Sequence, residues 1–255
     1  MDEVRTIQDT PYTVSNMVKK RIAWIDCAKG IAILLTVIGH VFSGTGKESI
    51  MRGMIFSFHM PLFFILSART THFSRDAGSF FCKIRKSARH LLIPAAVIVV
   101  LTAIFFPPEA YNWEYFRGLL YTVLFSSGVK TSFAGITIRA IGIPWFLVCL
   151  FLGRAMYDYL QMKLNAAELF ITCAIASTLG VLLGSGQWLP FSLDIALSCM
   201  LFFYAGDKMK ALSVEKSPWK MLFISACVWM ITLYFEFPDP AVASYLELAG
   251  RRYPI

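Results

Sequence analysis

The sequence predicts an all-α integral membrane protein, built as a bundle of transmembrane helices. Of its 255 residues, 57% are hydrophobic and 16% are charged, and the mean hydropathy is +0.61, so the chain is more apolar than an ordinary soluble domain. Apolar stretches long enough to cross a bilayer recur, and they are continuous rather than alternating, which favours helices over a β-barrel. Basic residues cluster between these stretches. The net charge of +8 is therefore explained by membrane topology and requires no nucleic acid partner.

The apolar stretches predict about seven to eight spans within one transmembrane domain, residues 21–255. The polar tail 1–20 ends in basic residues and is expected to stay in the cytoplasm, with the chain in the cell (plasma) membrane. The expected spans are 22–42, 51–68, 91–106, 143–160, 169–184, 191–205 and 219–235. The stretch 115–125 is short for a crossing. Treating it as a partial segment leaves the lysines at 208–220 on the same side as the basic stretch 69–90, which favours seven crossings.

The first span carries ionisable side chains within an apolar helix. At 100° per residue, Asp26, Lys29, Thr36 and His40 fall within about 80° of one another on one helix face. Ionisable groups inside a membrane usually face a protein interior or a wet cavity, so this face predicts a polar channel. Two simpler interpretations stay open. Asp26 and Lys29 are spaced for a helix ion pair, and His40 has the pattern of a core histidine or an interfacial anchor.

The second span carries His59 just before Pro61, where the missing backbone donor predicts a kink. Antiparallel packing of the first two spans would bring His59 near His40. Downstream, residues 69–90 contain six lysines and arginines against one acid, Asp76. Arginine binds phosphate through two hydrogen bonds, so this run is a candidate anion site, although it also suits a simple topology signal.

Three later groups are weaker candidates. Trp145, at a predicted membrane interface, is either an aromatic anchor or part of a substrate site. Asp194 lies in an apolar span and is either a helix cap or a functional carboxylate. Arg154 and Asp158 are spaced for an ion pair. The cysteines have no metal-binding or redox spacing, so we expect no metal site.

Several of these stretches, taken in order, resemble acyltransferase family 3, a family of integral membrane enzymes that O-acylate carbohydrates. The first span matches through Arg21, Asp26, Lys29, Gly30, Gly39 and His40, and the second through Phe58, His59, Met60, Pro61 and Ser67. Weaker matches are Lys86, Arg89 and Pro94, then Pro144 to Leu147, then Pro190 and Asp194. The branch most similar is the fucose O-acetylase-like group.

The chain departs from the family pattern in three ways. Ala68 stands where a glycine is usual, and His72 replaces the second arginine of an Arg-x-x-Arg motif, which removes a permanent charge. The family also has more spans than this chain, so two interpretations stay open: a member shortened at its C-terminal end relative to the family, or a fragment.

The resemblance implies an acyl-CoA donor, acetyl-CoA above all, and a hydroxyl acceptor on a glycan or glycolipid. His40 is then the expected general base, with His59 as partner or second choice, Lys29 a charge-neutralising group and Asp26 its orienting acid. Arg69, Arg85, Lys86 and Arg89 are expected to bind the phosphates of acyl-CoA, and Trp145 and Asp194 the acceptor. Both a direct transfer and an acyl-enzyme relay fit this set. A proton-coupled transporter and a non-catalytic remnant are the competing interpretations.

Overall fold

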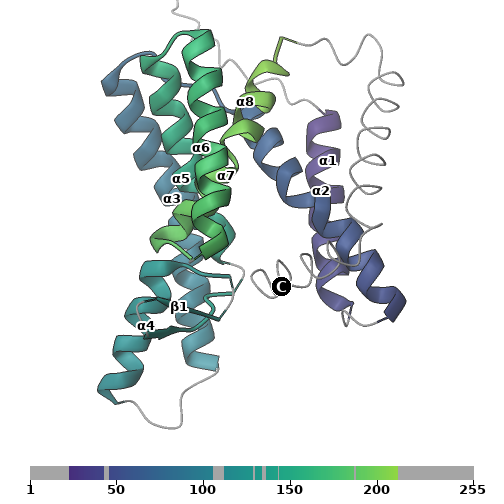
Figure 1. Ribbon diagram of the computed structural model, residues 1–255, viewed down its shortest axis with the longest axis vertical. Helices are drawn as coiled ribbons and strands as arrows, with labels where there is room; N and C mark the ends of the chain where they lie inside the picture. Colours follow the sequence, from purple (N-terminus) through teal and green to yellow (C-terminus); the bar gives the residue numbers. More distant parts are fainter. Residues whose placement is uncertain are drawn as a thin grey trace, which may run out of the picture.

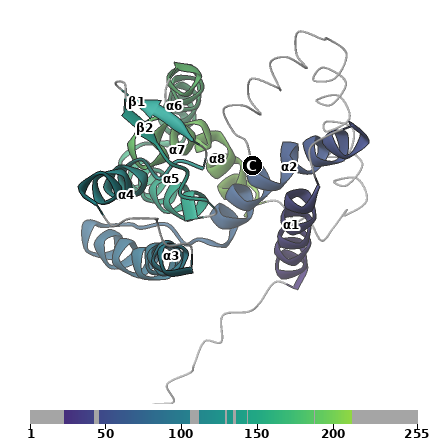
Figure 2. The same ribbon diagram turned by 90° about the horizontal axis from the view of Figure 1, so that it is seen from below.

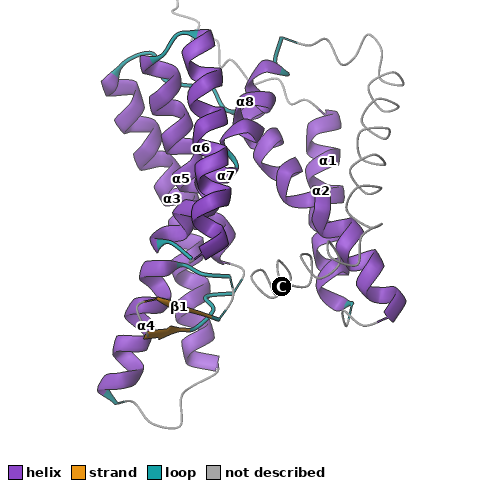
Figure 3. Cartoon of the chain, viewed as in Figure 1, coloured by secondary structure: helices purple, strands orange, loops and turns teal. Residues whose placement is uncertain are grey.

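The computed structural model describes residues 23–42, 46–105, 112–128, 130–133, 136–142, 144–186 and 188–211. The predicted all-α class is confirmed, because helices make up almost all of this part of the chain (Figures 1 and 3). The helices are α1 (Ala23–Val41), α2 (Gly46–Thr70), α3 (Ala77–Phe105), α4 (Trp113–Phe125), α5 (Pro144–Lys163), α6 (Ala166–Gly186), η1 (Pro190–Ser192), α7 (Leu193–Ser198) and α8 (Met200–Lys208). A small antiparallel hairpin, β1 (Thr131–Phe133) with β2 (Ile136–Ile138), was not predicted.

Fewer helices qualify as membrane spans than the seven to eight predicted. Within the described residues, four are long and apolar enough, by length and composition: Ala23–Val41, Met51–Thr70, Ala77–Phe105 and Ala166–Gly184. Helix α5 has 20 residues, includes Arg154, Asp158 and Lys163, and is not among these four. Helix α4 has 13 residues, about 20 Å of helix, which is shorter than a hydrocarbon core of about 30 Å. The predicted tail 1–20 and span 219–235 lie outside the described residues.

The predicted span 191–205 is broken into η1, α7 and α8. Phe191 and Ser192 have φ values of 58° and 52°, in the left-handed region that side chains other than glycine rarely adopt. Cys199 then separates α7 from α8. Apolar composition alone does not reveal such a break, because the residues on either side are those of a continuous helix.

Helix α3 begins at Ala77, well before the apolar stretch that the sequence identified as its span, and Pro94 therefore lies in its interior rather than in its first turn. Asp76 precedes the helix and accepts a hydrogen bond from the Ser79 backbone N–H at 2.9 Å, which is the usual arrangement of a helix cap. Hydrogen bonds from Ser79 hold the pKa of the Asp76 carboxyl below its ordinary value. The basic stretch is thus largely helical, and it carries its charges on α3.

The connection between α2 and α3 is fixed to α5 by Asp158. This carboxylate is buried (6% exposed) and accepts hydrogen bonds from the Ser74 backbone N–H at 2.5 Å and the Ser74 hydroxyl at 2.8 Å. The predicted ion pair between Arg154 and Asp158 is wrong, because these two side chains do not come within salt-bridge distance. The salt bridge found among the described residues joins Lys210 to Asp207. Asp158 holds the chain after α2 instead.

Helix α2 lies between α1 and the remaining helices. Figures 1 and 2 show α1 packed beside α2, with α3 at the opposite edge of the molecule. The core behind α2 is formed by Phe64 of α2, Cys149 and Tyr157 of α5, and Met200 and Phe203 of α8. At Gly206, α8 comes so close to α2 that a methyl group there would collide with the Ile65 carbonyl oxygen. The α2–α8 contact therefore depends on the absence of a side chain at position 206.

Replacing Gly206 by alanine is expected to destabilise the fold by about 1–3 kcal/mol, the usual cost of forcing extra atoms into a packed interface. Thermal unfolding of the detergent-purified protein measures this loss. The matched control is Gly118→Ala in α4, where a methyl group would meet nothing within 4 Å and where alanine favours the helix by up to about 1 kcal/mol. Equal melting temperatures for the two variants would contradict the α2–α8 contact.

Candidate functional site

The two histidines of the first two helices pack on one phenylalanine ring. The His40 ring lies 5.6 Å from the Phe56 ring, edge to face, and the His59 ring lies 4.9 Å from it. His40 is exposed, whereas His59 is buried (4% exposed). His59 Nδ1 lies 3.1 Å from the Ile55 carbonyl oxygen. Because a carbonyl oxygen only accepts, Nδ1 carries the proton in this hydrogen bond, and the lone pair of the neutral ring is on Nε2.

This arrangement, which we call the His40 end of the α1–α2 pair, depends on Gly39. A methyl group at Gly39 would lie 2.8 Å from Phe56 Cε1 and 3.2 Å from Ile55 Cγ2. The backbone of α1 at Gly39 therefore packs directly against these two side chains of α2. Arg52, one turn before Phe56 on α2, places its guanidinium carbon 5.5 Å from the centre of the same ring. Two imidazoles and one guanidinium therefore surround Phe56.

The opposite end of the α1–α2 pair, the Thr70 end, is rich in hydrogen-bond donors. Lys29 Nζ lies 3.4 Å from Thr70 Oγ1. The Arg69 guanidinium stacks on the Trp24 ring at 4.9 Å and donates a hydrogen bond to the Met209 carbonyl oxygen. Trp24 Nε1 and Arg69 Nε are both buried, and neither has a hydrogen-bond partner among the described residues. Asp26 is exposed on α1.

The two ends are about 16 Å apart, because Lys29 and His40 are eleven residues apart on a helix that rises about 1.5 Å per residue. The structure therefore brings His40 together with His59, and Lys29 together with the end of α2 that carries Arg69. It does not bring Lys29 to His40.

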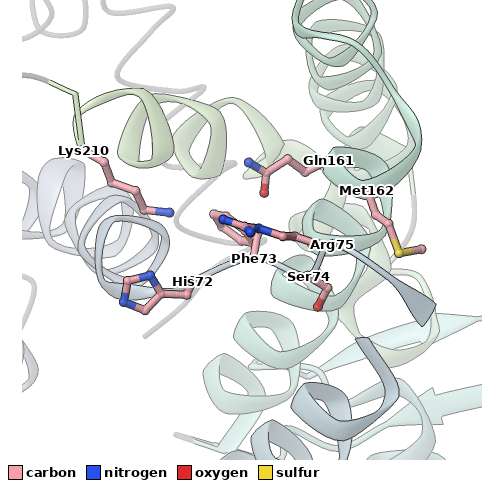
Figure 4. Close-up of a pocket in the computed structure, with 7 residues that line it drawn as sticks. All are labelled: His72, Phe73, Ser74, Arg75, Gln161, Met162 and Lys210. Carbon is pink, nitrogen blue, oxygen red and sulfur yellow. The ribbon is translucent and has the colours of Figure 1, made fainter. Parts of the chain in front are cut away.

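A pocket of about 530 Å³ opens beside the Thr70 end (Figure 4). It is lined by His72, Phe73, Ser74, Arg75, Gln161, Met162 and Lys210. Lys210 Nζ sits 4.1 Å from the centre of the Phe73 ring and donates to the Thr71 carbonyl oxygen at 2.6 Å. Arg69 lies next to this pocket. It donates a hydrogen bond to the Met209 carbonyl oxygen, and the following residue, Lys210, lines the pocket.

One wall of this pocket is held by Asp207 of α8. Its carboxylate accepts hydrogen bonds from Lys210 Nζ at 2.8 Å, Tyr157 Oη at 3.1 Å and Gln161 Nε2 at 3.2 Å. The other amide atom, Gln161 Oε1, is buried and has no hydrogen-bond partner within the described residues. The wall thus presents a free acceptor among cationic side chains. Sequence reasoning missed this pocket, since its lining comes from three segments that lie far apart in the chain.

The remaining predicted phosphate ligands lie elsewhere. Arg85, Lys86 and Arg89 are exposed on α3, which packs mainly on α5, and none of the three lines the pocket. Of the four cations predicted to bind acyl-CoA, Arg69 is the one that the structure places at the Thr70 end.

Trp145 and Asp194 lie in a separate cluster at the start of α5. The Trp145 ring meets the Trp188 ring at 6.1 Å, edge to face, and a methyl group at Gly128 would lie 2.8 Å from the Trp145 indole. Asp194 is buried (1% exposed), and its carboxylate accepts a hydrogen bond from the Leu189 backbone N–H at 3.4 Å. This contact is structural in character, because it ties the broken segment before α7 to the helix.

Comparison with known proteins identifies one family. A family model described as an acyltransferase domain matches residues 22–249, which include every site described above. No curated protein and no solved structure matches the chain. The match does not distinguish branches of the family, so the fucose O-acetylase-like branch stays a prediction.

The packing of His59 behind Phe56 predicts its chemical reactivity. Diethyl pyrocarbonate should modify the exposed His72 and His90 quickly and the buried His59 slowly, and Phe56→Ala should speed the modification of His59 several-fold. Peptide mass spectrometry follows each histidine separately. Phe81→Ala, which removes an exposed ring of α3, is the control. If His59 reacts as fast as His90 in the unaltered protein, the packing described here is wrong.

Proposed function

Because the chain belongs to acyltransferase family 3, with the domain spanning residues 22–249, we propose that it moves an acyl group from acyl-CoA to a carbohydrate hydroxyl. The family and the four apolar helices make it an integral membrane acyltransferase. The finer assignments are our proposal: acetyl as the group moved, a cell-surface or exported glycan or glycolipid as acceptor, and the cell membrane, with a cytoplasmic amino terminus, as location. The observation that carries the proposal is the α1–α2 pair, which has donors for an anion at one end and imidazoles at the other.

The Thr70 end suits the nucleotide part of acyl-CoA. That part carries a pyrophosphate and a ribose phosphate, which require cationic and N–H donors. Arg69 and Lys29 lie at this end, and His72, Arg75 and Lys210 line the adjoining pocket. The buried N–H groups of Trp24 and Arg69, which lack acceptors among the described residues, are the groups that phosphate oxygens would satisfy. A volume of about 530 Å³ falls within the range of small-molecule sites, about 300–1,000 Å³.

The His40 end suits the transfer step. The acceptor hydroxyl oxygen attacks the thioester carbonyl carbon while an imidazole takes the hydroxyl proton; the carbon–sulfur bond then breaks, and the proton goes to the departing CoA sulfur. His40 is exposed, so it is the imidazole that an acceptor can reach, and His59 supports it through the shared Phe56 ring. The Arg52 guanidinium beside the same ring supplies positive charge for the oxyanion that forms during transfer.

The distance between the two ends is consistent with this division of labour. The nucleotide and the thioester of acyl-CoA are joined by a long, linear pantetheine arm. Lys29 and His40 are about 16 Å apart along α1, so a donor that engages both ends must extend along the helix. The pantetheine arm gives acyl-CoA this extended shape. The same distance argues against a compact substrate that engages Lys29 and His40 at once.

His40→Ala is expected to lower CoA release by at least about 100-fold, because general base catalysis contributes about 10²–10⁴ in rate, and to leave acetyl-CoA binding intact. The assay follows CoA release from acetyl-CoA by purified protein with a cell-envelope glycan extract. His90→Ala, which removes an exposed histidine of α3, should keep full activity. Full activity in His40→Ala would disprove the base assignment. An acetylated histidine trapped on the protein would replace direct transfer by a relay.

Arg69→Ala is expected to weaken acetyl-CoA binding about tenfold, through the loss of charge-assisted hydrogen bonds. Arg89→Ala removes the same charge from the exposed face of α3, and we expect a clearly smaller effect. Isothermal titration with acetyl-CoA compares the two. A larger loss for Arg89 would move the donor site to α3. Absence of any acetyl-CoA binding by the unaltered protein would instead favour the transporter or the non-catalytic remnant.

A further inference from the structure

A small cleft between α3 and α5 combines cations with an unsatisfied hydroxyl. It is lined by Thr71, Lys83, Ile84, Ser87, Phe151, Arg154, Ala155 and Asp158. Ser87 Oγ is buried, and no described residue bonds to it. Lys83 precedes Ser87 by one helical turn, and Arg154 faces them from α5. The cleft volume is about 20 Å³, so it has room for the oxygen atoms of a larger group seated at its mouth and not for a whole ligand.

The α3–α5 cleft offers cations and hydrogen-bond donors to an anion. Lys83 and Arg154 line it together with one carboxylate, Asp158, and Asp76, which attracts Lys83, lies outside its lining. Each Asp158 oxygen accepts a hydrogen bond from Ser74, and the carboxylate attracts the Arg154 guanidinium electrostatically. The hydrogen bonds of the described residues include none donated by the Arg154 guanidinium, although this side chain is partly buried. The buried Ser87 hydroxyl and the Arg154 guanidinium can therefore form further hydrogen bonds, and an oxyanion supplies acceptors for both.

The position of the cleft along α3 identifies the source of the oxyanion. Beyond residue 90, α3 exposes a continuous apolar face, formed by Ile93, Val97, Ile98, Val100, Leu101, Ile104 and Phe105. Ser87 lies eighteen residues before Phe105, about 27 Å along the helix. This is close to the thickness of a hydrocarbon core, about 30 Å. When the apolar face is immersed in lipid, Ser87 and Lys83 therefore lie at the level of the lipid headgroups.

We propose that the α3–α5 cleft binds the phosphate of an anionic phospholipid, whose acyl chains lie along the apolar face of α3. The phosphate oxygens accept hydrogen bonds from Ser87 Oγ, Lys83 Nζ and the Arg154 guanidinium. Two further cations, Lys86 and Arg89, are exposed on the same part of α3 and favour a headgroup with net negative charge over a zwitterionic one. The proposal does not depend on acyl transfer, since none of these residues belongs to the α1–α2 pair or lines the pocket beside it.

The test uses the full-length protein, purified in detergent and stripped of lipid. Thermal unfolding is followed while phosphatidylglycerol, phosphatidylcholine or inorganic phosphate is added. We expect phosphatidylglycerol to stabilise the protein at about tenfold lower concentration than phosphatidylcholine, and inorganic phosphate to have no effect. Ser87→Ala leaves every charge in place and should weaken the response to phosphatidylglycerol about fivefold, the loss of one hydrogen bond. Arg154→Gln should weaken it about tenfold or more.

The control is Arg85→Gln, which removes one charge from the same helix at an exposed position outside the cleft. It should change the response to phosphatidylglycerol by less than about twofold. The proposal fails if Arg85→Gln and Arg154→Gln weaken the response equally, because the attraction would then be a general property of a basic helix. It fails as well if the two lipids act alike, or if inorganic phosphate alone reproduces the effect. Should Arg154→Gln not fold, Ser87→Ala and Lys83→Gln give the same comparison.

Discussion

Helix α2 approaches both of its neighbours closely, and both approaches are possible only because a glycine lies at the contact. Gly39 of α1 meets Phe56, and Gly206 of α8 meets the backbone at Ile65. The first contact fixes the helix that carries His40 against the helix that carries His59. The second fixes α8, and with it Asp207 and Lys210, against the end of α2. Both candidate regions are therefore positioned by one helix, through contacts that any larger side chain would open.

The polar groups inside this apolar fold follow one rule, which is that a buried donor or acceptor must find a partner. Lys29 meets Thr70, His59 binds the Ile55 carbonyl, and Asp207 accepts hydrogen bonds from Tyr157, Gln161 and Lys210. The exceptions are few: Trp24 Nε1, Arg69 Nε, Gln161 Oε1 and Ser87 Oγ are buried without partners in the described part of the chain. All four lie in or beside one of three places: the Thr70 end, its pocket and the α3–α5 cleft. The three unpartnered donors, Trp24 Nε1, Arg69 Nε and Ser87 Oγ, are the groups on which the two proposed anion sites rest.

The sequence predicted the features that depend on local pattern. The helical class follows from continuous apolar stretches, and the meeting of His40 with His59 follows from two consecutive helices joined by a short loop. Features that depend on distant residues were not accessible. Lys210 reaches Phe73 and Thr71 across more than 130 positions, and Asp158 binds Ser74 although Arg154 is the partner that helix spacing suggests. The break at Phe191 and Ser192 was equally hidden, since both have a left-handed backbone that the identities of these two residues do not predict.

The basic run 69–90 shows why charge counted along a sequence is a poor guide to charge in space. As a run it resembled one phosphate-binding patch. In the structure the chain leaves α2 at Thr70, is held to α5 through Ser74 and starts α3 at Ala77, so the run is divided between two surfaces. Arg69 and Arg75 stay with α2 and the pocket, whereas Lys83, Arg85, Lys86 and Arg89 follow α3 toward α5 and the membrane face. The two proposals use the two parts differently: the pocket cations would bind a soluble donor, and the α3 cations would meet lipid headgroups. The turn between α2 and α3 thus places residues that are adjacent in the sequence on two separate surfaces.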